Sequence, residues 1–575
     1  TSTFPDGSNP TFAVGDVVGV LLDKDDDKLY FTKNGSYVAS MNAETGTNGI
    51  DISAHSGEVA FITCGNNAST ATQLSLNAGQ RTFVGTPPDG YLSLCTQNLP
   101  TPTIEKPSEH LGITTYASVG TATTVTGLSF SPDLVWQKQA RGSGGNDRHF
   151  LTDSVRGAGL ALRSDSTAVE AASDAVESFT SDGWTVGAGA ANANQSGNTY
   201  VGWAWNGGGA PSKTYTVKVV DDGGNKYRFD DFGTSAVTLE LEEGGTYTFD
   251  QSDSSNGNGG GHPLRFATQA DAANDSEYTT GVETNGTPGT AGAYTRITVA
   301  SGAPTLYYYC TNHSGMGGQV NTNSTTGSSN FDGSVQSVVK HNSTAGFSIV
   351  KWTSSNSAAG TYDTIGHELN ASPGLVITKR LDTADSWYSA HGFDLTKFGK
   401  LDLTTEFQNA GTAWGDGITS SVIGMRIGNF VNGNEDMIAY CFSEVEGYSK
   451  FGTYAGTNAD VGPYIYTGFR PAFVMIKNTT LASSAYTSWY MIDSERATYN
   501  PTDYLRALWA NQTFPEGKRG NGDASPSGGF ITIDMLSNGF SIPNTGGGNH
   551  ELSQDNYNYL YLAFAELPFK KARAR

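Results

Sequence analysis

Four side chains that bind soft metal ions lie close to the middle of the sequence. Cys310, His313 and Met316 follow one another at three-residue spacing, and His262 stands further towards the N-terminus, at the start of an apolar segment. One thiolate, two imidazoles and one weakly bound thioether are the donors of a trigonal copper site with an axial methionine. These residues therefore predict a copper site, and the sequence holds no second set of this kind.

Residues 213–325, which surround these side chains, resemble the cupredoxin family of blue-copper proteins. The resemblance rests on a lone early histidine, His262, and on Cys-x-x-His-x-x-Met after the strand 305–310. It implies a Greek-key β-sandwich that holds its ligands rigid while copper changes valence, with His262, Cys310, His313 and Met316 as those ligands. Two states of the site stay open: a copper centre, and an empty site in which Cys310 is a buried thiol.

Residues 1–98 resemble the C-terminal half of a SPRY domain, an interaction module without catalytic residues. The resemblance rests on a Gly-Asp-x-x-Gly strand from Gly15, a Lys-Asn-Gly turn ending at Gly35, and a Pro-Pro-x-Gly-Tyr closure ending at Tyr91. The Asn-Gly pair predicts a tight hairpin, and a further strand is expected near 58–63.

Two features of this N-terminal region bear on its boundaries and its ligands. The acidic run 23–27 lacks the alternation of an EF-hand loop, so we predict a solvated hairpin turn in place of a calcium site. The chain opens at Thr1 without Met and within this domain, so we expect a segment upstream of it.

Three stretches of the remaining chain repeat one pattern. Each opens with a proline, a strand and a lysine, at 132–138, 373–379 and 471–477. Each closes on an aromatic-rich strand, at 200–205, 437–442 and 559–564. Recurrence of whole strand sets at this length indicates repeated domains and not a solenoid.

We therefore predict an all-β chain of tandem antiparallel β-sandwiches, related to SPRY and jelly-roll domains, with an inserted cupredoxin-like sandwich. The predicted domains are 1–98 (SPRY-like), 108–208 (repeat 1), 213–325 (cupredoxin-like), 330–446 (repeat 2) and 447–575 (repeat 3, with a basic tail). The sandwiches are expected to stack into a stiff rod. Only the segment 167–179 is a candidate amphipathic helix.

Composition and charge narrow the classes of partner. The 575 residues include 72 Gly and only 16% charged residues, which favours short strands and tight turns. The net charge of −22 argues against nucleic-acid and anionic-membrane partners, and no run of about 18 apolar residues is present to insert into a membrane. The basic tail 569–575 is expected to be solvated, with docking on an acidic neighbouring subunit as the alternative.

The four cysteines show no paired spacing that would indicate a disulfide framework or a zinc motif. Cys64, Cys95 and Cys441 are interpreted as core thiols. Large β-domains without disulfides fit assembly in a reducing cytoplasm, followed by use outside it.

The mosaic of modules resembles the large structural proteins of tailed bacteriophages from marine bacteria, with tail fibres and other virion appendages as the nearest comparison. This resemblance implies a virion protein, assembled in the host cytoplasm and active outside the cell, that attaches to a host surface. Its partners would be other virion proteins and a host-surface glycan or protein. It also implies a symmetric homo-oligomer, with a trimer as one form.

Two other classes of function were weighed against this one. The first is an extracellular or periplasmic copper protein of the cupredoxin type that transfers electrons and carries adhesive modules. The second is an enzyme, which we do not expect because no catalytic motif is present and the pairs His149/Asp153 and His391/Asp394 read as structural. Four aromatic residues were considered as sugar-stacking groups and assigned to the core instead: Trp184, Trp387, Tyr388 and Trp414.

Overall fold

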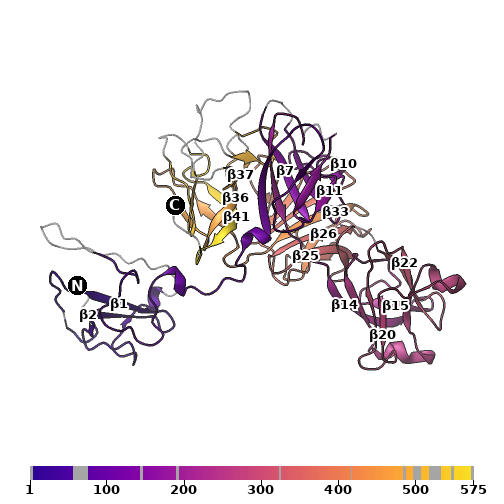
Figure 1. Ribbon diagram of the computed structural model, residues 1–575, viewed down its shortest axis with the longest axis horizontal. Coiled ribbons are helices and arrows are strands. Elements are labelled where there is room, and N and C mark those ends of the chain that lie inside the picture. The colour runs from indigo at the N-terminus through magenta and orange to yellow at the C-terminus, as the bar shows by residue number, and fades with distance from the viewer. Residues whose placement is uncertain are drawn as a thin grey trace. The chain divides into compact units, whose positions relative to one another are not determined.

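The structure is a computed structural model that describes residues 4–8, 10–55, 75–142, 147–188, 193–322, 325–415, 417–482, 487–496, 507–516, 533–544 and 550–571. The chain is almost entirely β, which confirms the predicted fold class. It forms two compact units, residues 1–101 and 102–575 (Figure 1). The helices of the described residues are short 3-10 helices, and none is long and apolar enough to cross a membrane.

The N-terminal unit contains the predicted hairpin. Its sheet consists of β1 (Val18–Asp23), β2 (Lys28–Lys33), β3 (Ser36–Tyr37) and β4 (Ile50–Asp51). Asn34 and Gly35 join β2 to β3 with φ of 51° and 85°, the left-handed conformations that make Asn-Gly a hairpin turn. The strand expected near 58–63 and the thiol of Cys64 lie outside the described residues.

The acidic run between β1 and β2 forms a turn held by its own groups. The Asp23 carboxylate accepts hydrogen bonds from the backbone N–H groups of Asp25 and Asp26, both at 3.1 Å. Lys24 pairs with Asp27 at 2.9 Å. These contacts agree with the predicted hairpin turn.

Residues 213–325, here called the inserted domain, form a sandwich of two five-stranded sheets (Figure 1). One sheet contains, in spatial order, β15 (Asn225–Phe229), β14 (Ser212–Asp221), β17 (Thr246–Asp250), β21 (Tyr294–Thr298) and β20 (Val282–Asn285). The other contains β16 (Leu239–Glu240), β23 (Gly318–Asn321), β22 (Leu306–Cys310), β18 (Leu264–Ala267) and β19 (Glu277–Tyr278). Two pairings, β14 with β17 and β16 with β23, are parallel, and the others in these sheets are antiparallel.

The three repeats build main sheets with the same strand order. Repeat 1 has β5 (Leu111–Ala117), β13 (Thr199–Trp205), β7 (Leu134–Arg141) and β8 (His149–Asp153). Repeat 2 has β26 (Phe347–Thr353), β33 (Asp436–Phe442), β28 (Leu375–Arg380) and β29 (Tyr388–His391), extended by β24 (Ser328–Asn330), β25 (Ser337–Asn342), β30 (Lys397–Lys400) and β31 (Gln408–Asn409). Repeat 3 has β34 (Ser449–Ala455), β41 (Asn558–Pro568), β36 (Phe469–Asn478), β37 (Trp489–Asp493) and β38 (Leu508–Trp509).

Each repeat also carries a smaller sheet. In repeat 1 it consists of β11 (Ser178–Thr180), β12 (Gly183–Val186) and β6 (Thr123–Val125). In repeat 2 it consists of β27 (Tyr362–Gly366) and β32 (Val422–Arg426), and in repeat 3 of β35 (Tyr464–Tyr466), β40 (Gly539–Ser541) and β39 (Asp534–Leu536). The helix considered at 167–179 is wrong: the segment contains β10 (Ala171–Ala172), paired with β9 (Leu160–Ala161), and enters β11. Burial of Ala175 and Val176 in the core of repeat 1 overrides the helical pattern.

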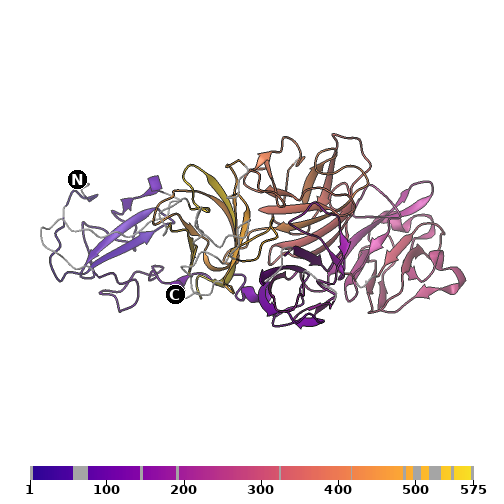
Figure 2. The ribbon, with the colours of Figure 1, turned by 90° about the horizontal axis from the view of Figure 1, so that it is seen from above.

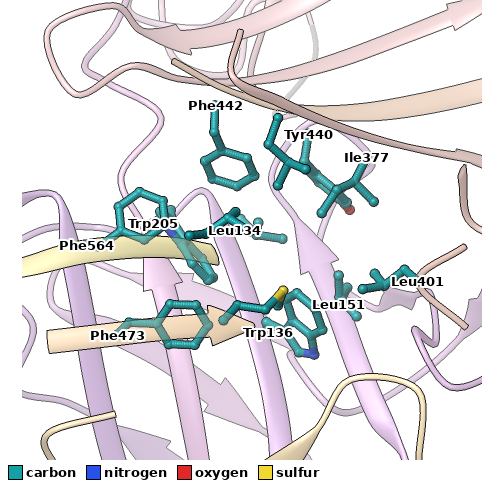
Figure 3. Close-up of a pocket in the computed structure, with 13 residues that line it drawn as sticks. Leu134, Trp136, Leu151, Trp205, Ile377, Leu401, Tyr440, Phe442, Phe473 and Phe564 are labelled. Atoms are coloured by element: carbon teal, nitrogen blue, oxygen red, sulfur yellow. The ribbon is translucent and has the colours of Figure 1, made fainter. Parts of the chain in front are cut away.

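The three main sheets bury one shared apolar cluster. Trp205, Phe442 and Phe564 occupy the same register in repeats 1, 2 and 3, opposite Leu134, Leu375 and Phe473. Figure 2 shows the strands of the three repeats together, and Figure 3 shows these side chains converging from three directions. A cavity of about 20 Å³ remains between them, and its lining is apolar, so it offers a water molecule no polar partners.

Hydrogen bonds join the repeats in a closed cycle. The side chain of Trp387 in repeat 2 donates to the carbonyl of Arg163 in repeat 1 at 2.8 Å. Trp489 in repeat 3 donates to Lys400 O in repeat 2 at 2.9 Å, and His149 Nε2 in repeat 1 lies 2.8 Å from Trp509 O in repeat 3. Each repeat therefore touches both others, which corrects the expectation of a rod.

The lysine that ends each repeat's opening motif is buried at these boundaries. Lys138 and Lys477 stand opposite His149 and Trp489. Both of them, and Lys379 of repeat 2, are fully shielded from solvent. Their ammonium groups donate to backbone carbonyls, among them Thr167 O of the neighbouring repeat for Lys379 and Thr404 O for Lys477. Burial lowers the pKa of Lys138 and Lys477 to about 7, and that of Lys379 to about 8.

Candidate metal centre

Two neighbouring strands of the inserted domain bring the predicted ligands together. β18 pairs with β22 so that Leu264 lies opposite Cys310. His262 stands two residues before Leu264 and therefore faces the same side of the sheet as Cys310. The loop that follows Cys310 turns back towards β23 and returns His313 to the cysteine. Alternation along the strands thus explains why residues far apart in sequence meet on one face.

The donor atoms form a compact triangle. Cys310 Sγ lies 3.8 Å from His262 Nδ1 and 3.6 Å from His313 Nδ1. The donor atoms of all three residues lie within 4.8 Å of one another, and the two imidazole rings are 4.5 Å apart between centroids. An ion with bonds of about 2.0 Å to nitrogen and about 2.3 Å to sulfur in a trigonal plane separates such atoms by roughly 3.7 Å. The triangle therefore fits a transition-metal ion.

The local electrostatics favour a neutral imidazole at His262. Its side chain is buried, and burial together with the neighbouring His313 lowers the pKa of His262. A neutral imidazole keeps the lone pair that a metal ligand needs. The Nε2 atom of His262 is buried and has no hydrogen-bond partner among the residues that the structure describes, and a ligand's second nitrogen usually has one.

The segment that carries His262 is fixed by surrounding polar groups. The backbone N–H of His262 donates to Asn256 O at 2.8 Å. Its carbonyl accepts hydrogen bonds from the Tyr227 hydroxyl at 2.9 Å and from the Gln251 amide at 2.7 Å. Asn256 in turn donates to Val217 O at 2.7 Å. Tyr227, Gln251 and Asn256 could not be identified as supports from the sequence, because their role depends on contacts with backbone atoms.

The loop after Cys310 is tied to the His262 segment. Thr311 N donates to Pro263 O at 3.2 Å, and the Asn312 amide donates to Gly261 O at 3.0 Å. Glycine is required at 317, since a β-carbon there would lie 1.6 Å from Tyr308 O. These contacts hold His313 near the other donors without a metal.

Met316 is buried in the apolar cluster that also contains Cys310. Its backbone carbonyl accepts a hydrogen bond from Tyr227 N at 3.0 Å. The structure thus places the fourth predicted residue in the interior beside the triangle.

The histidine–aspartate pairs considered as catalytic are engaged elsewhere. His149 accepts from Trp136 Nε1 at 2.9 Å, and Asp153 pairs with Arg156 at 2.5 Å. Burial lowers the pKa of His391 to about 4, and the Asp394 carboxylate binds Thr396. Neither pair forms a hydrogen bond between its side chains.

The burial of the four aromatic residues tests their assignment to the core. Trp184, Trp387 and Trp414 are buried, and Tyr388 is partly buried. Exposed tyrosines stand instead at positions 362, 464 and 466, and the last two, on one strand, were not among the residues considered from the sequence. The signal was the alternation Tyr-Ile-Tyr, in which an inward isoleucine leaves both tyrosines on the outer face.

Comparison with known proteins gives one match. A family model described as a domain of unknown function, DUF7483, matches residues 106–220 and 320–568. The matched residues include most of the three repeats, and the gap between them falls within the inserted domain. No curated protein and no solved structure matches the chain.

Proposed function

Since this chain belongs to the DUF7483 family, whose function is unknown, we propose its role from its own residues: a virion structural protein whose inserted domain binds copper. The observation that carries the copper proposal is the triangle of Cys310 Sγ, His262 Nδ1 and His313 Nδ1. The interlocked repeats support the structural role.

The residues of the centre have distinct tasks in this proposal. Cys310 binds as the thiolate, and His262 and His313 bind through Nδ1, while Met316 supplies a weak fourth donor from the same loop. Tyr227 and Gln251 hold the His262 carbonyl, which limits movement of that ligand. Bound copper supplies reversible one-electron chemistry, or a cross-link between two loops of the domain.

Copper titration of the purified full chain tests this proposal. A thiolate-bound Cu(II) gives an intense visible charge-transfer band. The variant Cys310→Ser should abolish this band, whereas the variant Cys441→Ser should retain it. Cys441 is the matched control because it is a buried thiol outside the cluster of metal-binding side chains found among the described residues, and burial raises its pKa to about 12. If desalted protein retains no copper, or if Cys310→Ser retains as much as the wild type, the copper proposal fails.

For the whole chain we propose a tail fibre or another surface appendage that mediates attachment to a host cell. The closed cycle of bonds between repeats makes a rigid body of the kind that a particle surface needs. Its partners in this proposal are other virion proteins and a host-surface glycan or protein, and it acts as a symmetric homo-oligomer, for which a trimer is one form. The imidazole of His149, held between Trp136 and the Trp509 carbonyl, supports a role without catalysis.

The copper triangle also favours a second candidate, an extracellular or periplasmic electron-transfer protein with adhesive modules. Immunogold electron microscopy of the source culture with an antibody against residues 330–575 separates the two. Gold on phage tails or capsids supports the virion role. Label confined to bacterial envelopes, beside bare particles, rejects that role and favours electron transfer.

A further inference from the structure

Two tyrosines stand exposed on one strand of repeat 3. Tyr464 and Tyr466 of β35 are 46% and 57% exposed, whereas Ile465 between them is buried. Both rings are oriented by the fold. The Tyr464 hydroxyl contacts Asn538 O at 3.5 Å, and a β-carbon built on Gly468 would lie 3.7 Å from the Tyr466 hydroxyl. Ordered rings lose less side-chain entropy when a ligand binds.

The rest of this sheet face combines small and polar residues with one leucine. Phe540 and Met535 point into the core, so the outward positions of β40 and β39 are Gly539, Ser541, Asp534 and Leu536. Tyr464 lies opposite Ser541, which lies opposite Asp534. A carboxylate and a hydroxyl therefore line up beside the tyrosines, and no lysine or arginine is among these residues.

The other repeats lack this pair at the same register. Gly183 of repeat 1 lies against Val125 O and Thr126 Cα. Gly539 of repeat 3 lies in the same way against Ile465 O and Tyr466 Cα. Thr126 thus corresponds to Tyr466, and Thr124, which pairs with Thr185, corresponds to Tyr464. Repeat 2 has Thr364 and Gly366 beside its inward Ile365. The fold therefore does not need aromatic residues at these positions.

We propose that Tyr464 and Tyr466, with Asp534 and Ser541, form a binding platform for neutral glycans. Side chains at i and i+2 of a strand lie about 7 Å apart, so the two rings offer neighbouring apolar faces to the C–H faces of sugar rings. The carboxylate and the hydroxyl accept hydrogen bonds from sugar hydroxyls at the edge of the platform. This inference rests on the proposed attachment role and supplies its ligand class.

Charge selects neutral glycans over anionic ones. The chain carries a net charge of −22, and the four residues of the platform contribute one carboxylate and no lysine or arginine. A uronate-rich or sulfated polymer would meet repulsion from this charge, whereas a neutral polymer avoids that cost.

The test uses native gels that contain hydroxyethylcellulose, galactomannan, dextran or, as the anionic probe, alginate. We expect the full chain to be retarded by at least one neutral polymer and not by alginate. Tyr464→Thr and Tyr466→Thr, which install the residues of repeat 1, should each weaken binding roughly tenfold, as for tyrosine anchors at interfaces. Tyr362→Thr is the matched control, because Tyr362 is a lone tyrosine, 39% exposed, on β27 of repeat 2.

Asp534→Asn provides a second variant that alters only the carboxylate, with an expected loss of severalfold. Retention of full affinity by the Tyr464→Thr/Tyr466→Thr double variant, retardation by alginate alone, or no retardation by any neutral polymer would overturn the platform. Immunogold labelling of virions is independent of these gels. Gold on virions without glycan binding would reject the platform but keep the virion role. Glycan binding without gold on virions would reject the virion role but keep the platform.

Discussion

The inserted domain buries a cluster drawn from its own strands and Phe331, whereas the three repeats bury one cluster to which all of them contribute. The inserted domain therefore completes its core almost alone. Repeats 1 and 2 each bury a further cluster of their own, but the shared cluster needs all three repeats, since the rings of Trp205, Phe442 and Phe564 pack on one another (Figure 3). The inserted domain is therefore a module with its own core, and the repeats form a closed assembly around a common one.

Besides Phe331, which packs on Tyr215 and Phe229, charged groups connect the two regions. Glu242 of the inserted domain pairs with Lys340 of repeat 2 at 2.7 Å, and both are buried. Lys213 pairs with Glu368, which also lies 2.8 Å from His341 Nδ1. The family match leaves out residues 221–319, which agrees with a domain that was added to the repeats.

The largest loss of folding stability is expected at a buried ion pair of one repeat that is hydrogen-bonded to a side chain of another. Asp153 and Arg156 of repeat 1 form a buried ion pair, and Tyr440 of repeat 2 donates to Asp153 at 2.8 Å. Asp153→Ala should lower the free energy of unfolding of the repeats by about 3–5 kcal/mol, because it leaves a buried arginine short of a partner. Urea denaturation measures this cost. The control is Glu444→Ala, which breaks the exposed pair with Lys450 and should cost at most about 1 kcal/mol. Equal costs would contradict the interlocked arrangement.

Copper binding should stabilise the inserted domain and leave the stability of the repeats unchanged. Free copper at about a hundred times its dissociation constant should stabilise the inserted domain by about 3 kcal/mol. The repeats should be unaffected because they hold none of the ligands. Calorimetry should therefore show two transitions, only one of which moves with copper, and Cys310→Ser should remove the movement. A single transition that shifts as a whole would show that the two regions unfold together.

Acid should loosen the boundary between the two regions. Burial opposes ionisation of Glu368, but the hydrogen bond with His341 and the charge of Lys213 prevail and lower its pKa from 4.5 to about 2. A lowered carboxyl pKa stabilises the folded state above pH 4.5, and this contribution is lost as the pH falls from about 4.5 to about 2. Glu368→Gln should cost about 2 kcal/mol at pH 7 and flatten the pH dependence in that window. Glu283→Gln, at the exposed pair with Arg296, should leave the unfolding curves unchanged.

The smallest effect per group is expected from the buried lysines of the repeats. Burial lowers the pKa of Lys477 from 10.5 to about 7, so above pH 7 the unfolded chain binds the proton that the folded chain has released. Stability should therefore rise with pH above 7, by about 1 kcal/mol between pH 7 and pH 8 for this lysine. Lys477→Met should reduce that slope, and Lys450→Met, at an exposed lysine, should keep it. A slope that the first variant leaves intact would rule out this linkage.

Local patterns in the sequence predicted much of the fold and the candidate centre. Alternation of apolar and polar residues indicated the strands, and the Asn34–Gly35 pair indicated its hairpin, because both signals act over a few residues. Cys310, His313 and Met316 were identifiable because metal chemistry restricts both their types and their spacing. Their supports were not identifiable, since Tyr227 and Gln251 act on a backbone carbonyl that every residue possesses.

The strands, the three repeats and the candidate ligands can be read from the sequence, because each depends on residues near one another in the chain. The closure of the repeats into a cycle becomes visible only in the folded chain. The bonds that close it end on the backbone carbonyls of Arg163, Lys400 and Trp509, whose side chains carry no signal of this role. The same holds for Lys138, Lys379 and Lys477, whose charge suggests a solvated end of a strand. Their burial follows from the neighbouring repeat that covers them, and no local pattern contains that neighbour.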